Sequence, residues 1–220
     1  MIIMASFVET VITEEELKAA QAFHGHKCPA MPQGLRAGHI AMDILGVQRA
    51  RGGELVAIVE TGYHHFSGCF VDGVMVATGC TLGKGNLVQK PLGKFALTLI
   101  EPKTGRAARV TPGYERMSQC LNMDFFTLRA QGVPPYEVDP AVVEPLIEDV
   151  LTRPWQEIFS VNKFARYPFA RVPEDFSAVQ CAGCGELVVT SYAHKFQDQW
   201  YCEPCLNEML HAGHRVTESR

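Results

Sequence analysis

The sequence lacks any apolar run that approaches the roughly 20 residues needed to span a bilayer. Its N-terminus also lacks the basic start of a secretory signal peptide, and Glu9 interrupts the short apolar stretch there. Basic residues are not in excess, because the net charge is -4, so a nucleic acid or an anionic membrane would gain no electrostatic attraction. We therefore expect a cytoplasmic protein whose partners include neither nucleic acid nor membrane.

The cysteines lack both a secretory context and the closely spaced run that holds a ferredoxin-like iron–sulfur cluster. Eight cysteines could form four disulfides, but without a signal peptide metal binding or thiol chemistry is the better interpretation. The remaining composition is ordinary: 47% of the 220 residues are apolar and 20% are charged, which predicts a packed core. The polar clusters within such a chain need a functional explanation.

One short polar segment, residues 23–34, concentrates strong metal ligands. His24, His26 and Cys28 occupy alternate positions, and imidazole and thiolate groups bind transition metals. The same groups also make a thiol nucleophile with its base. The two prolines that follow Cys28 in this segment predict a loop, because proline disfavours a continuing helix.

A second polar stretch, residues 60–86, supplies further candidates. It begins as a predicted polar turn that ends at Cys69, continues through an apolar run that fits either a helix or a strand, and finishes in a glycine-rich turn. That turn is not a P-loop, because only three residues separate Gly79 from Gly83 and Lys84 precedes another glycine. Two interpretations stay open: the turn binds an anion through backbone N–H groups and Lys84, or it is a plain tight turn.

The pattern elsewhere predicts both helices and strands. Thr13 and Glu16 form a capping box for a helix that runs to about Phe23. Further helices are predicted over 33–45, 114–131 and 140 to about 151, and a strand over 55–59. Residues 94–101 and 107–111 predict a hairpin with Gly105 in its turn, and 157–164 fits either type.

Residues 180–220 are predicted to form a zinc module. Two Cys-x2-Cys pairs, separated by seventeen residues, supply Cys181, Cys184, Cys202 and Cys205. Four thiolates make the closed tetrahedral site of structural Zn²⁺. The order of knuckle, hairpin, knuckle and helix fits a treble clef, with a zinc ribbon as the alternative. The module carries three Lys/Arg against five Asp/Glu, which favours a protein partner over nucleic acid. We expect a first domain over 1–170, a linker over 171–179 and this module over 180–220.

Two of these motifs resemble the FmdE-like family, which takes its name from a formylmethanofuran dehydrogenase component. The first is Phe23-His-Gly-His-Lys-Cys-Pro29, and the second runs from Cys69-x2-Asp72 to Thr78-Gly-Cys-Thr-x-Gly-Lys-Gly-Asn86. The resemblance implies an α+β domain that forms an intertwined homodimer, and the four-cysteine module looks like the one appended to some members. It also implies a cleft whose cofactor-binding residues are His24, His26, Cys28, Cys69, Asp72, Cys80 and Asn86, together with Lys84.

Three functional hypotheses follow. In the first, the cleft binds a second transition metal through His24, Cys28, Cys69 and Cys80, with a redox or accessory role linked to molybdo- or tungsto-enzymes. In the second, the site is a metal-free thiol enzyme, in which Cys28 is the nucleophile and His24 or His26 activates it. Lys84 and the glycine-rich turn would then bind an anionic substrate. In the third, the zinc module recruits a partner protein or enzyme component to a dimeric scaffold. The small-molecule ligand itself stays unknown at this stage.

Overall fold

The structure is a computed structural model that describes residues 11–63, 65–170 and 174–215. The predicted N-terminal segment around Glu9, the start of the predicted linker at 171–173 and the end of the zinc module at 216–220 lie outside these ranges. The chain divides into two compact units, Met1–Phe169 and Ala170–Arg220. Within the described ranges, every helix is too short or too polar to cross a membrane.

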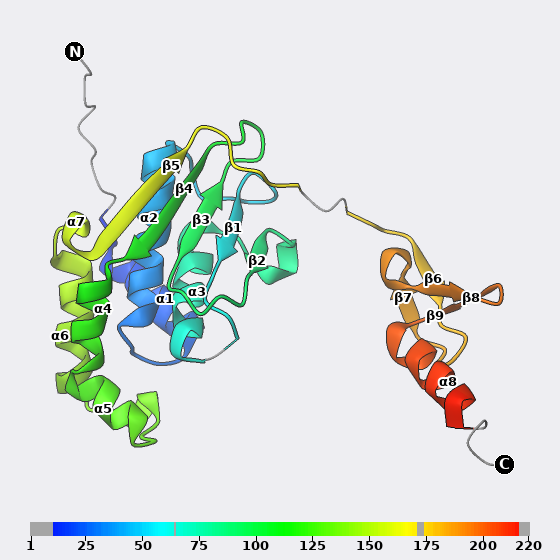
Figure 1. Ribbon diagram of the computed structural model, residues 1–220. Coiled ribbons are helices and arrows are strands. Elements are labelled where there is room, and N and C mark those ends of the chain that lie inside the picture. Colours follow the sequence, from blue (N-terminus) through cyan, green and yellow to red (C-terminus); the bar gives the residue numbers. More distant parts are fainter. Residues whose placement is uncertain (1–10, 64, 171–173, 216–220) are drawn as a thin grey trace. The chain divides into compact units, whose positions relative to one another are not determined.

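The first unit is built on a five-stranded mixed sheet with helices against it (Figure 1), which confirms the predicted α+β class. The strand order is β2-β1-β3-β4-β5, and only the β1–β2 pair is parallel. The strands are β1 Val56–Val59, β2 Leu87–Gln89, β3 Leu97–Ile100, β4 Ala107–Pro112 and β5 Phe159–Phe164. Gly105 has the positive φ predicted for the hairpin turn between β3 and β4.

The first two helices carry the His/Cys segment between them. Helix α1 spans Glu14–His24, and the Thr13 side chain accepts a hydrogen bond from the Glu16 N–H, as the capping box predicts. Helix α2 spans Ala30–Leu45 and therefore begins three residues before the predicted start. Pro32 does not prolong the loop, because a proline in the first helical turn gives up an N–H that has no partner in the helix.

The apolar run of the second polar stretch is a helix, α3, which spans His65–Thr78. It begins inside the predicted polar turn, so Cys69 lies on the helix and not at the end of a turn. The helix packs very closely on α2, because both helices present small residues where they cross. A Cβ atom added to Gly34 would lie 1.9 Å from the Phe70 carbonyl oxygen, and one added to Gly73 would lie 2.0 Å from that of Met31. Glycine at both positions thus brings the start of α2 against the first half of α3.

Helices α4 to α7 extend the helical layer beyond β5 in Figure 1. The predicted long helix over 114–131 is broken at positions 122–123 into α4 Tyr114–Leu121 and α5 Asp124–Ala130. A short 3-10 helix, η2 Pro135–Glu137, leads to α6 Pro140–Thr152, which begins at the predicted residue and is capped by the Asp139 side chain. Helix α7, Trp155–Ile158, then joins β5, so the segment over 157–164 contains both types of structure.

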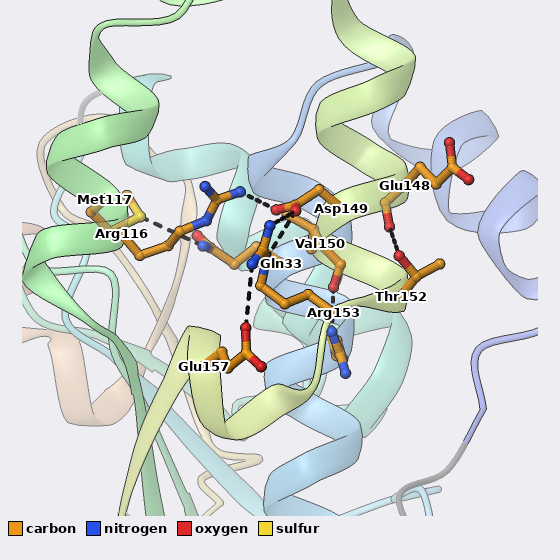
Figure 2. Close-up of polar contacts among 10 residues, drawn as sticks. Gln33, Arg116, Met117, Glu148, Asp149, Val150, Thr152, Arg153 and Glu157 are labelled. Atoms are coloured by element: carbon orange, nitrogen blue, oxygen red, sulfur yellow. Dashed lines mark hydrogen bonds and ion pairs between the residues drawn. The ribbon is translucent and has the colours of Figure 1, made fainter.

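Ion pairs hold these helices in place (Figure 2). Asp149 on α6 accepts hydrogen bonds from both Arg116 on α4 and Arg153 at the end of α6. Arg153 also reaches Glu157 on α7 at 3.2 Å. The side chain of Gln33 on α2 donates to the Met117 sulfur at 3.5 Å, which ties α4 to the start of α2.

The second unit contains two small hairpins and a helix. Strand β6, Ala178–Gln180, pairs with β7, Leu187–Val189, and β8, His194–Phe196, pairs with β9, Gln199–Tyr201. A 3-10 turn, η3 Thr190–Tyr192, joins the hairpins, and α8 spans Glu203–Arg215. The sequence suggests a single hairpin between the two cysteine pairs, in which residues 187–190 pair with 195–200. This pairing is wrong: β7 pairs with β6, which contains two residues of the predicted linker, and the segment over 195–200 forms its own hairpin as β8 and β9.

Candidate functional site

Four metal-ligating side chains converge where α1, α2 and α3 meet. His24 ends α1, His26 and Cys28 lie in the connection to α2, and Cys69 lies one turn into α3. One ligand atom from each residue lies within 4.8 Å of all the others. The cluster is protected from solvent, because Cys28 and Cys69 are 4% and 6% exposed. The close packing of α2 on α3 therefore brings the first motif and the start of the second into one site.

The spacing of these atoms fits a tetrahedral metal ion. The His24 Nε2 atom lies 3.1 Å from His26 Nε2 and 3.4 Å from Cys28 Sγ. In a regular tetrahedron with ordinary zinc–nitrogen and zinc–sulfur bonds, neighbouring ligand atoms are about 3.3 to 3.8 Å apart. Two imidazoles and two thiols are also the donor set that zinc and other thiophilic metals prefer.

Asp72 fixes the orientation of one ligand. Its Oδ2 atom accepts a hydrogen bond from His24 Nδ1 at 2.7 Å, and the His24 side chain is only 4% exposed. In a metal-bound state, a proton held on Nδ1 by Asp72 would leave the Nε2 lone pair of His24 directed at the metal. A carboxylate behind a histidine ligand is the usual arrangement at protein metal sites. Asp72 therefore lies behind the cluster as a positioning residue, and does not contact its centre.

The electrostatics favour a thiolate at the centre of the cluster. The pKa of Cys28 lies well below its ordinary value, first because Cys69 donates a hydrogen bond to it and then because both histidines do, and these contacts outweigh burial. The pKa of Cys69 is raised in turn, because its proton is held by Cys28 and because it is buried. Burial lowers the pKa of His24, but hydrogen bonds to Asp72 and Cys28 outweigh it and raise the value to about 9.

A cleft of about 440 Å³ opens beside the cluster. Three of the four ligands line it, whereas His24 does not, so the cluster shows one side to the cleft. The lining is His26, Cys28, Pro29, Ala30, Cys69, Leu121, Phe125, Phe126, Arg129, Ala130 and Pro135. Its far wall comes from α4, α5 and η2, which the ion pairs of Figure 2 anchor through α4 and α6. The volume is typical of a small-molecule site.

The remaining candidates lie at the other end of α3. Thr78 is nine residues beyond Cys69, roughly 13 Å along the helix. Cys80 follows it, is fully buried and has its pKa raised by that burial, and lies outside the described metal-ligating group. Within one chain, therefore, the structure does not bring Cys80 to the ligands with which the sequence grouped it.

Asn86 and Lys84 also lie beyond the C-terminal end of α3, in the segment that contains Cys80. The Asn86 amide donates to the carbonyl oxygens of Gly52 and Leu55 at 2.7 and 3.1 Å, and its oxygen accepts from the Thr81 N–H at 2.9 Å. These bonds hold the glycine-rich turn, which forms the 3-10 helix η1 Leu82–Lys84, against the segment before β1. The Lys84 ammonium donates to the Ala50 carbonyl oxygen at 3.4 Å. Neither residue lines the cleft beside Cys28 within one chain.

The structure also adds residues that the sequence did not single out. Three residues of α5, Phe125, Phe126 and Arg129, line the cleft. Their segment carries an ordinary amphipathic pattern with no polar motif, so only the turn between α4 and α5 reveals which side faces the cluster.

A second four-residue group lies in the C-terminal unit. The sulfur atoms of Cys181, Cys184, Cys202 and Cys205 lie within 4.8 Å of one another, and those of Cys181 and Cys202 are 3.7 Å apart. The Cys202 N–H also donates to the Cys181 sulfur at 3.3 Å, which stabilises a thiolate there. The predicted cluster is therefore formed and suits a metal ion such as zinc.

Comparison with known families and proteins gives consistent results. The family model of "FmdE, Molybdenum formylmethanofuran dehydrogenase operon" matches residues 23–160. A "Probable S-adenosyl-L-methionine-binding protein" of Archaeoglobus fulgidus is 33% identical over 185 residues, a region that covers 80% of this chain. The chain spans about half (49%) of the length of that relative.

A solved structure shares the fold. It is the crystal structure of a tungsten formylmethanofuran dehydrogenase FmdE-like protein from Syntrophus aciditrophicus, with a TM-score of 0.54 and 23% identity. The match covers 89% of this chain and 92% of that one. Because the family model matches residues 23–160, which is more than half of the chain and includes the His/Cys segment and strands β1 to β4, we conclude that this chain belongs to the FmdE family.

Proposed function

We propose that this FmdE-family protein binds a thiophilic divalent metal at His24, His26, Cys28 and Cys69 and uses it on a small molecule in the adjoining cleft. The observation that carries the proposal is a buried cluster of two imidazoles and two thiols with tetrahedral spacing, one side of which faces a cleft. A metal bound there would supply a Lewis acid or an electron carrier. The chain's own contribution is to orient His24 through Asp72 and to keep Cys28 ionised.

The wider role that we propose is a redox or accessory one connected with molybdenum- or tungsten-dependent enzymes. The family description and the name of the Syntrophus aciditrophicus protein support that setting. We further propose that the protein is cytoplasmic, since metal-binding thiolates persist in a reducing compartment. We also propose that it forms a homodimer, as the resemblance to the family implies. The C-terminal unit is proposed to be a treble clef with structural zinc, because its second cysteine pair lies at the start of α8 and a hairpin lies between the two pairs.

Metal content of the full chain tests the two sites separately. We expect two metal ions per chain by elemental analysis in the wild type. A Cys28→Ser/Cys69→Ser double variant should keep one of them, and a Cys181→Ser/Cys205→Ser double variant should keep the other. Cobalt added to the second variant should give the intense sulfur-to-metal absorption of a thiolate site. The proposed N-terminal site would be refuted if the wild type held one ion per chain, even after metal is added back, and the Cys28→Ser/Cys69→Ser variant held the same amount.

S-adenosyl-L-methionine is a second candidate for the molecule in the cleft. The Archaeoglobus fulgidus relative is named for that ligand, and the cleft offers two aromatic rings, Phe125 and Phe126, against which an adenine could pack. Isothermal titration of the full chain with S-adenosyl-L-methionine tests it. Binding that a Leu121→Ser change at the cleft wall weakens would support this ligand. Binding that the change leaves unaltered would place the ligand elsewhere.

A further inference from the structure

Among the described residues, Arg129 is the one permanently charged side chain that lines the cleft beside the metal cluster. It lies in the last turn of α5, and its Nη1 group donates a hydrogen bond to the Val133 carbonyl oxygen. In the part of the chain that the structure describes, no carboxylate lies within 4 Å of its guanidinium. This distinguishes it from Arg109, Arg116 and Arg153, each of which is paired with an acid.

The cleft around Arg129 is otherwise apolar. Phe125 and Phe126 form its wall, Leu121 stands at its mouth with 47% of its surface exposed, and none of the described residues that line it is acidic. Partial burial of the Arg129 guanidinium removes some of its hydration, and no carboxylate compensates for that loss. An anionic group on a ligand would compensate for it. The guanidinium has five N–H donors, and its hydrogen bond to Val133 uses a single donor, so a planar carboxylate can still be bound through two bonds.

We infer that the cleft binds a small organic monocarboxylate, whose carboxylate pairs with Arg129 and whose apolar body packs on Phe125 and Phe126 toward Cys28 and Cys69. A volume of about 440 Å³ holds a molecule of this size, and its largely apolar walls suit an apolar body. The inference names the class of molecule that binds in the cleft. What the protein does with that molecule rests on the proposed function. Binding itself depends on Arg129 and the aromatic wall, and not on the metal.

A matched pair of probes isolates the charge. The full chain is titrated calorimetrically with 4-phenylbutyrate and with 4-phenylbutan-1-ol, which share an apolar body and differ in the carboxylate. We expect the acid to bind about tenfold more tightly than the alcohol, since a hydrogen-bonded ion pair in a partly buried site commonly contributes that factor. Arg129→Met should remove the preference and leave alcohol binding within about twofold. Leu121→Ser should weaken both probes equally.

Two further samples complete the test. Arg106→Met is the control, because Arg106 pairs with Glu101 in the β3–β4 turn, away from the cleft, and it should keep the full preference. The Cys28→Ser/Cys69→Ser variant should also prefer the acid, which separates this inference from the metal site. No binding of either probe, equal binding in the wild type, or a preference that survives Arg129→Met would overturn the inference. Loss of the preference in the cysteine variant alone would assign the carboxylate to the metal and overturn it too.

Discussion

Replacing Gly73 with alanine tests whether the close crossing of α2 and α3 builds the metal site. Gly73 directly follows Asp72 on α3 and faces the first turns of α2. Its added Cβ would lie 2.0 Å from the Met31 carbonyl oxygen and 2.4 Å from the Leu35 nitrogen. Both are backbone atoms, so no side chain can move aside. Ordinary contact begins at 3.4 Å, and the helices would therefore have to separate by about 1.4 Å.

That separation should cost both stability and metal affinity. Forcing an extra carbon into a packed core costs about 1 to 3 kcal/mol, and more where only the backbone can yield. Alanine recovers up to about 1 kcal/mol of helix propensity. Cys69 and Asp72 move with α3 while Cys28 and His24 do not. The Cys69 sulfur would therefore move away from the other three ligand atoms, which lie within 4.8 Å of it, and the tetrahedral spacing would be lost. We expect zinc affinity at the cluster to fall by at least tenfold.

Gly68→Ala is the matched control, because it lies on the same helix and its Cβ would meet no atom within 4 Å. It should stabilise the protein by about 0.5 to 1 kcal/mol, so the difference between the two variants measures the steric cost without the propensity gain. Urea unfolding in a Trp200→Phe background leaves Trp155 as the sole tryptophan and reports the first unit. Equal stability and equal zinc affinity of the two variants would refute the account of the site given above.

Three further predictions concern the other polar contacts. Asp72→Asn should weaken metal binding at the N-terminal cluster by about 10- to 100-fold, measured by chelator competition, while the four-cysteine site is unaffected. Gly183→Ala should instead remove metal from the four-cysteine site, because its Cβ would lie 2.9 Å from the Cys205 sulfur; retained metal by elemental analysis would contradict this. Arg109 holds the pKa of Glu60 below its ordinary value through two hydrogen bonds, so the pair should stabilise the fold above the unfolded carboxyl pKa of about 4.3, and this contribution of about 1 to 3 kcal/mol should be lost as the pH falls further. Glu60→Gln should be less stable than wild type at pH 7 and equal to it at low pH, whereas a constant difference across the range would disprove the linkage.

Much of the fold could be predicted because its signals are local. The capping box at Thr13, the Asp139-Pro140 helix start and the hairpin turn at Gly105 each act within a few residues, and each appears in the structure as predicted. The four-cysteine cluster follows equally from spacing. The start of α2 was misplaced because proline has opposite meanings in the first turn of a helix and in its interior.

The candidate site was harder to predict because it depends on contacts between distant segments. Sequence spacing identified the ligand types but not which of the three thiols at positions 28, 69 and 80 share a centre. The wall at Phe125 and Arg129 gave no signal, since an amphipathic helix looks the same whether it covers a core or a cleft. Only the crossing of α2 and α3, set by glycines whose pattern is too short to interpret alone, decides these points.

The second motif therefore has two separate tasks, one at each end of α3. Its first part, Cys69 and Asp72, faces α1 and completes the metal cluster. Its last part holds the glycine-rich turn against the segment before β1, where Asn86 satisfies three backbone groups and Cys80 is fully buried. A fully buried amide with complete hydrogen bonding is what a structural clamp requires, because each unsatisfied backbone group there would cost about 1 to 3 kcal/mol. A single stretch of polar residues thus looks like one site in the sequence, although a 14-residue helix holds its two ends apart.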